Sequence, residues 1–195
     1  MNKYSHLGTS FDEILNHEIG HLLMNWHIGF KVQTIIINPK TRITRSIPSD
    51  KHKEATDAIM RSRYSRSVVQ ANLKHMKNYL LIFVAGDVML DLVKYNYNSD
   101  GMKTRTVAFQ ESQEAYKYES LGVDVDAIVK KSASILTRKK WDYEFLKLWL
   151  SHNSVDEELD FSFANLQLLN KKLRYPFRHL QLLRTLVLRQ VCVFH

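Results

Sequence analysis

Apolar residues recur at helical spacing in the segment that follows Ser10. The apolar positions are Ile14, Leu15, Ile19, Leu22, Leu23 and Trp26. They form one broad face of a helix with 3.6 residues per turn. Ser10, with Glu13 three residues later, has the form of a capping box and predicts the start of this helix. Gly29 predicts its end, because glycine takes the left-handed cap conformation without strain.

The pattern changes to that of a β-hairpin after this helix. Residues Phe30 to Ile37 are rich in β-branched side chains and are closed by Asn38-Pro39, which predicts a strand. The segment from Arg42 to Ile47 predicts a second, weaker strand that pairs with the first. The polar stretch from Pro48 to Lys53 is expected to be a loop.

From about residue 54 the pattern is helical almost to the end of the chain. The expected helices cover residues 54–69, 71–95, 102–118, 125–139, 143–151 and 161–174. Pro176 then interrupts the chain before a last amphipathic stretch, residues 179–193. The pattern therefore predicts a mainly α (α+β) fold with a small N-terminal hairpin or sheet. We expect one domain over residues 1–175, with a basic amphipathic segment over 176–195 docked on it.

Composition agrees with a globular protein that has no disulfide. Of the 195 residues, 45% are hydrophobic and 25% are charged, which is ordinary for a domain with a core. The single cysteine, Cys192, excludes an intrachain disulfide and a cysteine-based zinc knuckle, so any metal would be held by His, Asp and Glu. The N-terminus lacks a signal-peptide pattern, and Asp87 and Asp91 interrupt the longest apolar stretch, residues 79–93. We therefore expect a cytoplasmic protein.

The net charge of +8 favours acidic partners, and the chain after Lys171 carries basic residues with no Asp or Glu. No zinc-finger spacing or RNA-binding signature supports a nucleic-acid function. The C-terminal stretch could lie on an anionic membrane, but a terminal helix packed on the domain is the favoured interpretation. A basic scaffold that binds nucleic acid or membrane is therefore the least favoured hypothesis.

The motif His17-Glu18-Ile19-Gly20-His21 carries candidate chemistry. Residues four apart on a helix project from the same face, so His17 and His21 can direct imidazole nitrogens at one zinc ion. Glu18, beside the first ligand, can act as general base toward a metal-activated water. The motif thus predicts zinc as cofactor, His17 and His21 as ligands and Glu18 as the catalytic residue.

A hydrolytic zinc site needs a third protein ligand and one open position. His27 stands ten positions after His17, which is the spacing of the metzincins. That motif needs a glycine where Met24 stands here, and a helix continued to His27 would direct its ring elsewhere. The other candidates are acidic residues further along the chain.

Residues from Ser10 to Tyr118 resemble the peptidase domain of FtsH, the membrane-anchored AAA protease, and its small stand-alone relatives. The similarity lies in the HEIGH motif, in the strand Val32 to Pro39, and in Phe83 to Asp91, which resembles the family's LxGGRxAEE helix. The family's double glycine is replaced by Ala85-Gly86, and Asp87 stands in place of its arginine.

This resemblance implies a zincin-like helical domain whose third ligand is an aspartate at the start of another helix. Asp100 is the best match to that aspartate, with Glu111 and Glu114 as fallbacks. Asp87 and Asp91 are expected to support the site or the structure rather than to bind the metal.

The sequence thus predicts a zinc-dependent metallopeptidase that hydrolyses peptide bonds in a protein or peptide substrate. It contains no GxxxxGK[ST] phosphate loop, so hydrolysis is expected to be ATP-independent by itself or to use a separate ATPase or adaptor. The resemblance also suggests a homo-oligomer. The alternative hypothesis is a catalytically inactive peptidase-like module for binding or assembly.

Overall fold

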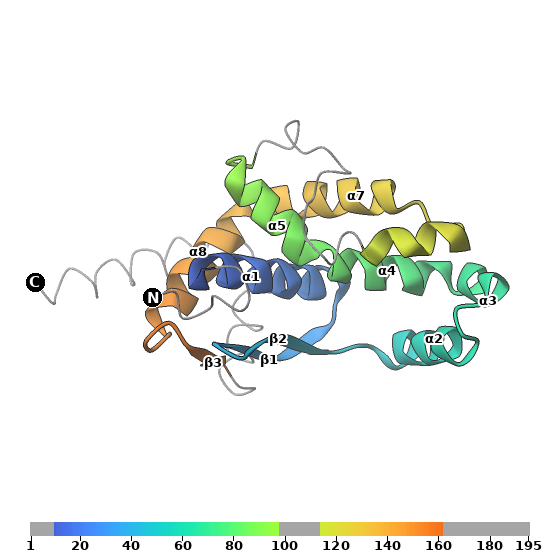
Figure 1. Cartoon of the computed structure of the whole chain (residues 1–195), viewed down its shortest axis with the longest axis horizontal. Coiled ribbons are helices and arrows are strands. Elements are labelled where there is room, and N and C mark those ends of the chain that lie inside the picture. The colour runs from blue at the N-terminus through green and yellow to red at the C-terminus, as the bar shows by residue number, and fades with distance from the viewer. Residues whose placement is uncertain (1–9, 98–113, 162–195) are drawn as a thin grey trace, which may run out of the picture.

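The computed structural model describes residues 10–97 and 114–161. Within these ranges the chain is mostly helical, with a three-stranded antiparallel sheet on one side of a central helix, α1 (Figure 1). The expected mainly α (α+β) class is therefore confirmed. The expected boundary between residues 175 and 176 lies outside the described residues.

Helix α1, Phe11–Ile28, begins and ends where the sequence predicts. Both hydrogen bonds of the capping box are present: the Ser10 backbone N–H donates to Glu13 Oε2 at 2.9 Å, and the Glu13 N–H donates to Ser10 Oγ at 3.2 Å. Gly29 closes the helix at φ 94° in the left-handed conformation. Most of α1 is buried, because the sheet covers one side and other helices pack on the rest.

The sheet contains one strand more than the predicted hairpin. Strands β1, Lys31–Asn38, and β2, Thr41–Ile47, pair antiparallel, with Asn38 opposite Thr41 beside the turn. Strand β3, Leu159–Phe161, pairs with the other edge of β1, so β1 is central and β2 lies at an edge. A helix was expected to begin at Phe161, and this prediction was wrong at that residue. A three-residue strand is too short to show period-2 patterning.

Two short helices replace the long helix expected over residues 54–69. Helix α2, Asp50–Arg61, begins inside the predicted loop because the Ser49 side chain caps it by accepting a hydrogen bond from the His52 N–H. It ends before Arg63 and Tyr64, which adopt φ of 50° and 60° and break the helix. Helix α3, Arg66–Ala71, follows.

The helix expected over residues 71–95 is also divided into two. Helix α4, Leu73–Phe83, and helix α5, Ala85–Lys94, meet at Val84. In Figure 1, α5 turns away from the direction of α4 and crosses α1. The apolar pattern continues through this bend because both helices bury their faces in the same core.

The described chain resumes at Glu114 with a short 3₁₀ helix, η3, Tyr116–Leu121, where the end of an α-helix was expected. Helices α7, Val125–Arg138, and α8, Lys140–His152, agree with the predicted pair. Helix α7 packs on α4 and α5, and α8 packs on α1. There the Tyr143 hydroxyl donates a 2.7 Å hydrogen bond to Asn16 Oδ1.

Among the described residues, no helix combines the length and apolar character that crossing a membrane requires. The basic C-terminal stretch lies outside the described residues, as does nearly all of the helix expected over 161–174.

Candidate metal centre

His17, Glu18 and His21 lie together on α1, where the helix faces α4, α5 and strand β2. One ligand atom from each side chain falls within a cluster whose members are all within 4.8 Å of one another. His17 and Glu18 are buried, while His21 is half-buried and borders a surface groove. The helical spacing therefore produces the predicted convergence of two imidazoles and one carboxylate.

The two imidazoles face each other through their Nε2 atoms. The Nε2 atoms of His17 and His21 are 3.0 Å apart, and the rings meet edge to face at 82°. His21 Nδ1 lies 2.8 Å from the Ile82 carbonyl oxygen, which can only accept, so His21 carries its proton on Nδ1. His21 therefore turns an Nε2 lone pair toward His17.

His17 lies beside a carboxylate of the neighbouring helix α5. Its Nδ1 lies 3.5 Å from Asp87 Oδ1, and both side chains are 2% exposed. A proton on Nδ1 suits the negative carboxylate and leaves a lone pair on Nε2. A carboxylate or carbonyl acceptor on the other ring nitrogen is the usual arrangement of metal-binding histidines, because it fixes the tautomer and the ring orientation.

The space between the two Nε2 atoms can hold a shared proton or a metal ion. With both protons on Nδ1, two Nε2 lone pairs would face each other at 3.0 Å, and a proton or a metal ion would relieve that repulsion. Neighbouring nitrogen ligands of a tetrahedral zinc are about 3.3 Å apart, given bonds of about 2.0–2.1 Å. The spacing and donor set of this pair therefore fit zinc.

Two glycines allow α5 to approach α1 at this point. A Cβ at position 86 would stand 2.5 Å from both Nδ1 and Nε2 of His17. A Cβ at position 20 would overlap the Ala85 carbonyl oxygen and stand 2.8 Å from Met89 Cβ. Glycine at both positions therefore brings Asp87 within reach of the His17 ring.

Glu18 is held by the edge strand of the sheet. The Thr44 hydroxyl, on β2, donates a 2.6 Å hydrogen bond to Glu18 Oε2. No donor in the described part of the chain is hydrogen-bonded to Glu18 Oε1. Thr44 therefore fixes the carboxylate and leaves one oxygen for another proton donor.

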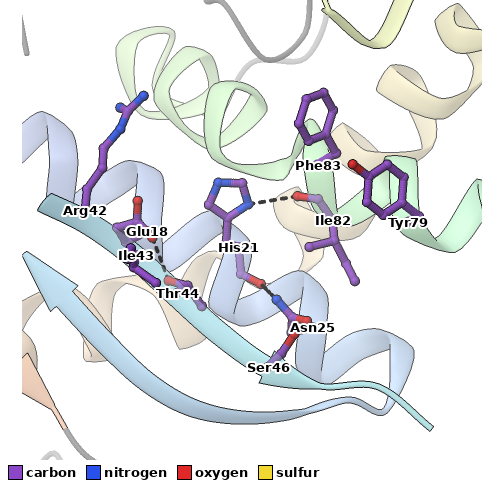
Figure 2. Close-up of a pocket in the computed structure, with 10 residues that line it drawn as sticks. All are labelled: Glu18, His21, Asn25, Arg42, Ile43, Thr44, Ser46, Tyr79, Ile82 and Phe83. Carbon is purple, nitrogen blue, oxygen red and sulfur yellow. Dashed lines mark hydrogen bonds between the residues drawn. The ribbon is translucent and has the colours of Figure 1, made fainter. Parts of the chain in front are cut away.

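Glu18 and His21 open into a groove with a volume of about 310 Å³. Figure 2 shows Arg42 and Glu18 on one side, Tyr79, Ile82 and Phe83 on the other, and the His21 ring between them. Tyr79 and Phe83 are stacked at an interplanar angle of 12° and form an aromatic wall. The groove thus combines a charged end, a candidate metal ligand and an apolar side.

The candidates for a third ligand are placed differently. His27 lies on α1, about 15 Å along the helix axis from His17, and is exposed, so it cannot reach the other two imidazoles. Glu114 is half-buried and is not a member of the described cluster. Asp100 and Glu111 lie outside the described residues. Of the described candidates, none completes the set.

Asp87 and Asp91 lie on α5, one turn apart, and both are buried. Asp87 approaches the ligand candidate His17, and its supporting role stays a prediction. Burial raises the pKa of Asp91; nearby Lys94 opposes this shift, and the negative charge of Asp87 adds to it.

Three contributors to the site were not foreseen in the sequence: Thr44, the Ile82 carbonyl and Arg42. Thr44 is separated from Glu18 by 26 residues, and Ile82 from His21 by 61, so no local spacing could connect them. The Ile82 carbonyl lies in the last turn of α4, where carbonyl groups lack partners within the helix. If the bend at Val84 had been predicted from the sequence, it would have indicated that the Ile82 carbonyl is available as an acceptor.

No family model, curated protein sequence or solved structure matches this chain. The resemblance to the FtsH peptidase domain therefore stays a prediction that depends on the motifs quoted above.

Proposed function

We propose that the chain is a zinc-dependent metallopeptidase in which His17 and His21 hold the metal and Glu18 is the general base. The observation that carries this proposal is the 3.0 Å approach of the two Nε2 atoms, beside a carboxylate that borders an open groove. Asp100 is our proposed third ligand. When bound, zinc would supply Lewis-acid chemistry, lowering the pKa of a water molecule to about 7 and polarising a peptide carbonyl.

The residues around the site have separate tasks in this proposal. Asp87 and the Ile82 carbonyl hold the two imidazoles with Nε2 turned inward. Thr44 holds Glu18 through Oε2, so Oε1 is the atom that accepts a proton from the attacking water. Glu18 then delivers that proton to the amide nitrogen as the C–N bond breaks, giving a carboxylic acid and an amine.

The test of the proposal is the substitution Glu18→Gln. Glutamine keeps the shape and the Thr44 contact but cannot take up a proton, so zinc content should be unchanged. The rate of cleavage of dye-quenched casein should fall at least about 100-fold, which is typical for loss of a general base. Casein is unfolded, so its cleavage does not depend on an ATPase.

A matched control is Glu54→Gln, because Glu54 is exposed on α2, away from the groove. This variant should keep both zinc and activity. Cleavage that survives Glu18→Gln would contradict the proposed mechanism. A zinc-loaded wild-type protein that cleaves no unfolded substrate would favour the inactive binding or assembly module instead.

A further inference from the structure

Arg42 is a groove residue to which the proposed hydrolysis assigns no task. Its half-buried side chain lines the groove with Glu18 (Figure 2). It forms no ion pair or hydrogen bond with the described residues, including Glu18. A guanidinium group with five donors is therefore available to an anion that enters the groove.

The position of Arg42 on β2 relates it to the reacting centre. Arg42 and Thr44 are two residues apart, so their side chains leave the same face of the strand, about 7 Å from each other. Thr44 holds Glu18, the proposed general base. If a peptide lies along β2, the residue that contacts Arg42 would therefore be about two residues away from the residue beside Glu18.

The outer edge of β2 can receive an extended peptide. In the described part of the chain β2 pairs only with β1, so the other edge of β2 offers free backbone donors and acceptors. An added strand would place alternate side chains toward the face that carries Arg42 and Thr44. Across the groove, Tyr79 and Phe83 provide an apolar contact for a neighbouring substrate side chain.

We propose that Arg42 determines specificity by binding a carboxylate of a peptide that lies along the free edge of β2. This proposal rests on the metallopeptidase function for its substrate class. The carboxylate could be an Asp or Glu side chain or the C-terminus of the peptide, and the experiment separates the two. Arg is the suitable partner, because its planar fork matches a carboxylate in two parallel hydrogen bonds.

The test measures binding rather than cleavage, so that it stands apart from the test of hydrolysis. The whole chain carrying Glu18→Gln is loaded with zinc, and peptide binding is followed by fluorescence anisotropy. The probes are dye-labelled alanine peptides with blocked ends, one Phe, and a single Glu placed at successive distances from it. Each is compared with a matched twin peptide that has Gln in place of Glu. A second matched twin has Gln and also a free, unblocked C-terminal carboxylate.

At the best spacing, the Glu peptide should bind roughly ten-fold more tightly than its Gln twin, as expected for a charge-assisted hydrogen bond. Arg42→Gln should abolish this difference, and Arg42→Lys should restore part of it. If the free C-terminus, rather than Glu, confers the Arg42-dependent gain, the carboxylate is the terminal one and the assignment of Arg42 stands.

Arg45→Gln is the matched control, because Arg45 is exposed on the same strand with its side chain on the opposite face. It should leave the preference unchanged, which separates a specific contact from attraction to a basic protein. Equal affinity for all twins, or a preference that survives Arg42→Gln or is lost in Arg45→Gln, would overturn the proposal. Absence of any peptide binding would overturn it too. If the wild-type chain cleaves casein but the binding assay shows no carboxylate preference, the peptidase proposal stands and this inference fails.

Discussion

In both His17 and His21, Nδ1 lies beside an acceptor group on another helix, and the two Nε2 atoms face each other. His21 donates to a backbone carbonyl, and His17 faces the Asp87 carboxylate. The two orienting groups differ in kind, because a carbonyl cannot be removed by substitution whereas the carboxylate can. Asp87 is therefore the residue at which the orientation of the pair can be tested.

We predict that Asp87→Asn weakens zinc binding by about 10- to 100-fold, the usual effect of removing a group that orients a metal-binding histidine. The amide is nearly isosteric but brings no negative charge to His17 Nδ1. The affinity is measured by competition with a zinc-binding dye.

Asp91→Asn serves as the control, because Asp91 is a buried carboxylate on the same helix and forms no hydrogen bond or ion pair with His17 in the described structure. Its zinc affinity should equal that of the unmodified chain. Equal losses in both variants would show that burial of charge on α5, rather than orientation of His17, determines the effect.

At the scale of helices and strands, the site depends on the contact between α1 and α5. Gly86 faces the His17 ring, and Gly20 faces the Ala85 backbone. These close approaches place the carboxylate of α5 beside the histidine of α1. A helix pair spaced by larger residues would separate Asp87 from His17.

We predict that Gly86→Ala lowers both zinc affinity and the free energy of unfolding. Alanine favours a helix over glycine by about 1 kcal/mol, but overpacking in a buried contact costs about 1–3 kcal/mol. The overlap should prevail, because the His17 ring is held by His21 and Asp87 and cannot move away without loss of those contacts. Urea denaturation and dye competition measure the two quantities.

Gly29→Ala is the control on α1, where nothing lies within 4 Å of the added Cβ but φ is +94°. It should cost about 1 kcal/mol of stability through backbone strain and leave zinc affinity unchanged. If Gly86→Ala binds zinc as tightly as the unmodified chain, the close helix contact does not set the geometry of the site.

Helices and strands whose ends are marked by neighbouring residues in the sequence were predicted. Elements whose position depends on contacts with distant parts of the chain were not. The capping box and Gly29 mark the two ends of α1 with residues next to the helix in sequence. The hairpin likewise has β-branched residues on both sides of a turn. The bend at Val84 and strand β3 have no such signal, because the apolar pattern is the same on both sides of the bend and the strand has three residues. Both depend on what the rest of the chain packs against them.

For the molecule as a whole, the same distinction applies to the candidate site. His17, Glu18 and His21 could be predicted because one helix turn brings them together. Thr44 and the Ile82 carbonyl reach them from a strand and from another helix, which only the folded chain places nearby. The third ligand is the remaining prediction, and Asp100 lies outside the described residues.

The most direct test of the proposed zinc site is anomalous X-ray scattering from crystals of the whole chain. The protein is purified without chelators, and data are recorded on both sides of the zinc absorption edge. We expect one strong anomalous peak between the Nε2 atoms of His17 and His21, with a carboxylate as a further ligand. Crystals of His21→Ala should lose that peak. Density without an anomalous peak between the two histidines, or zinc bound only to other side chains, would contradict the proposal.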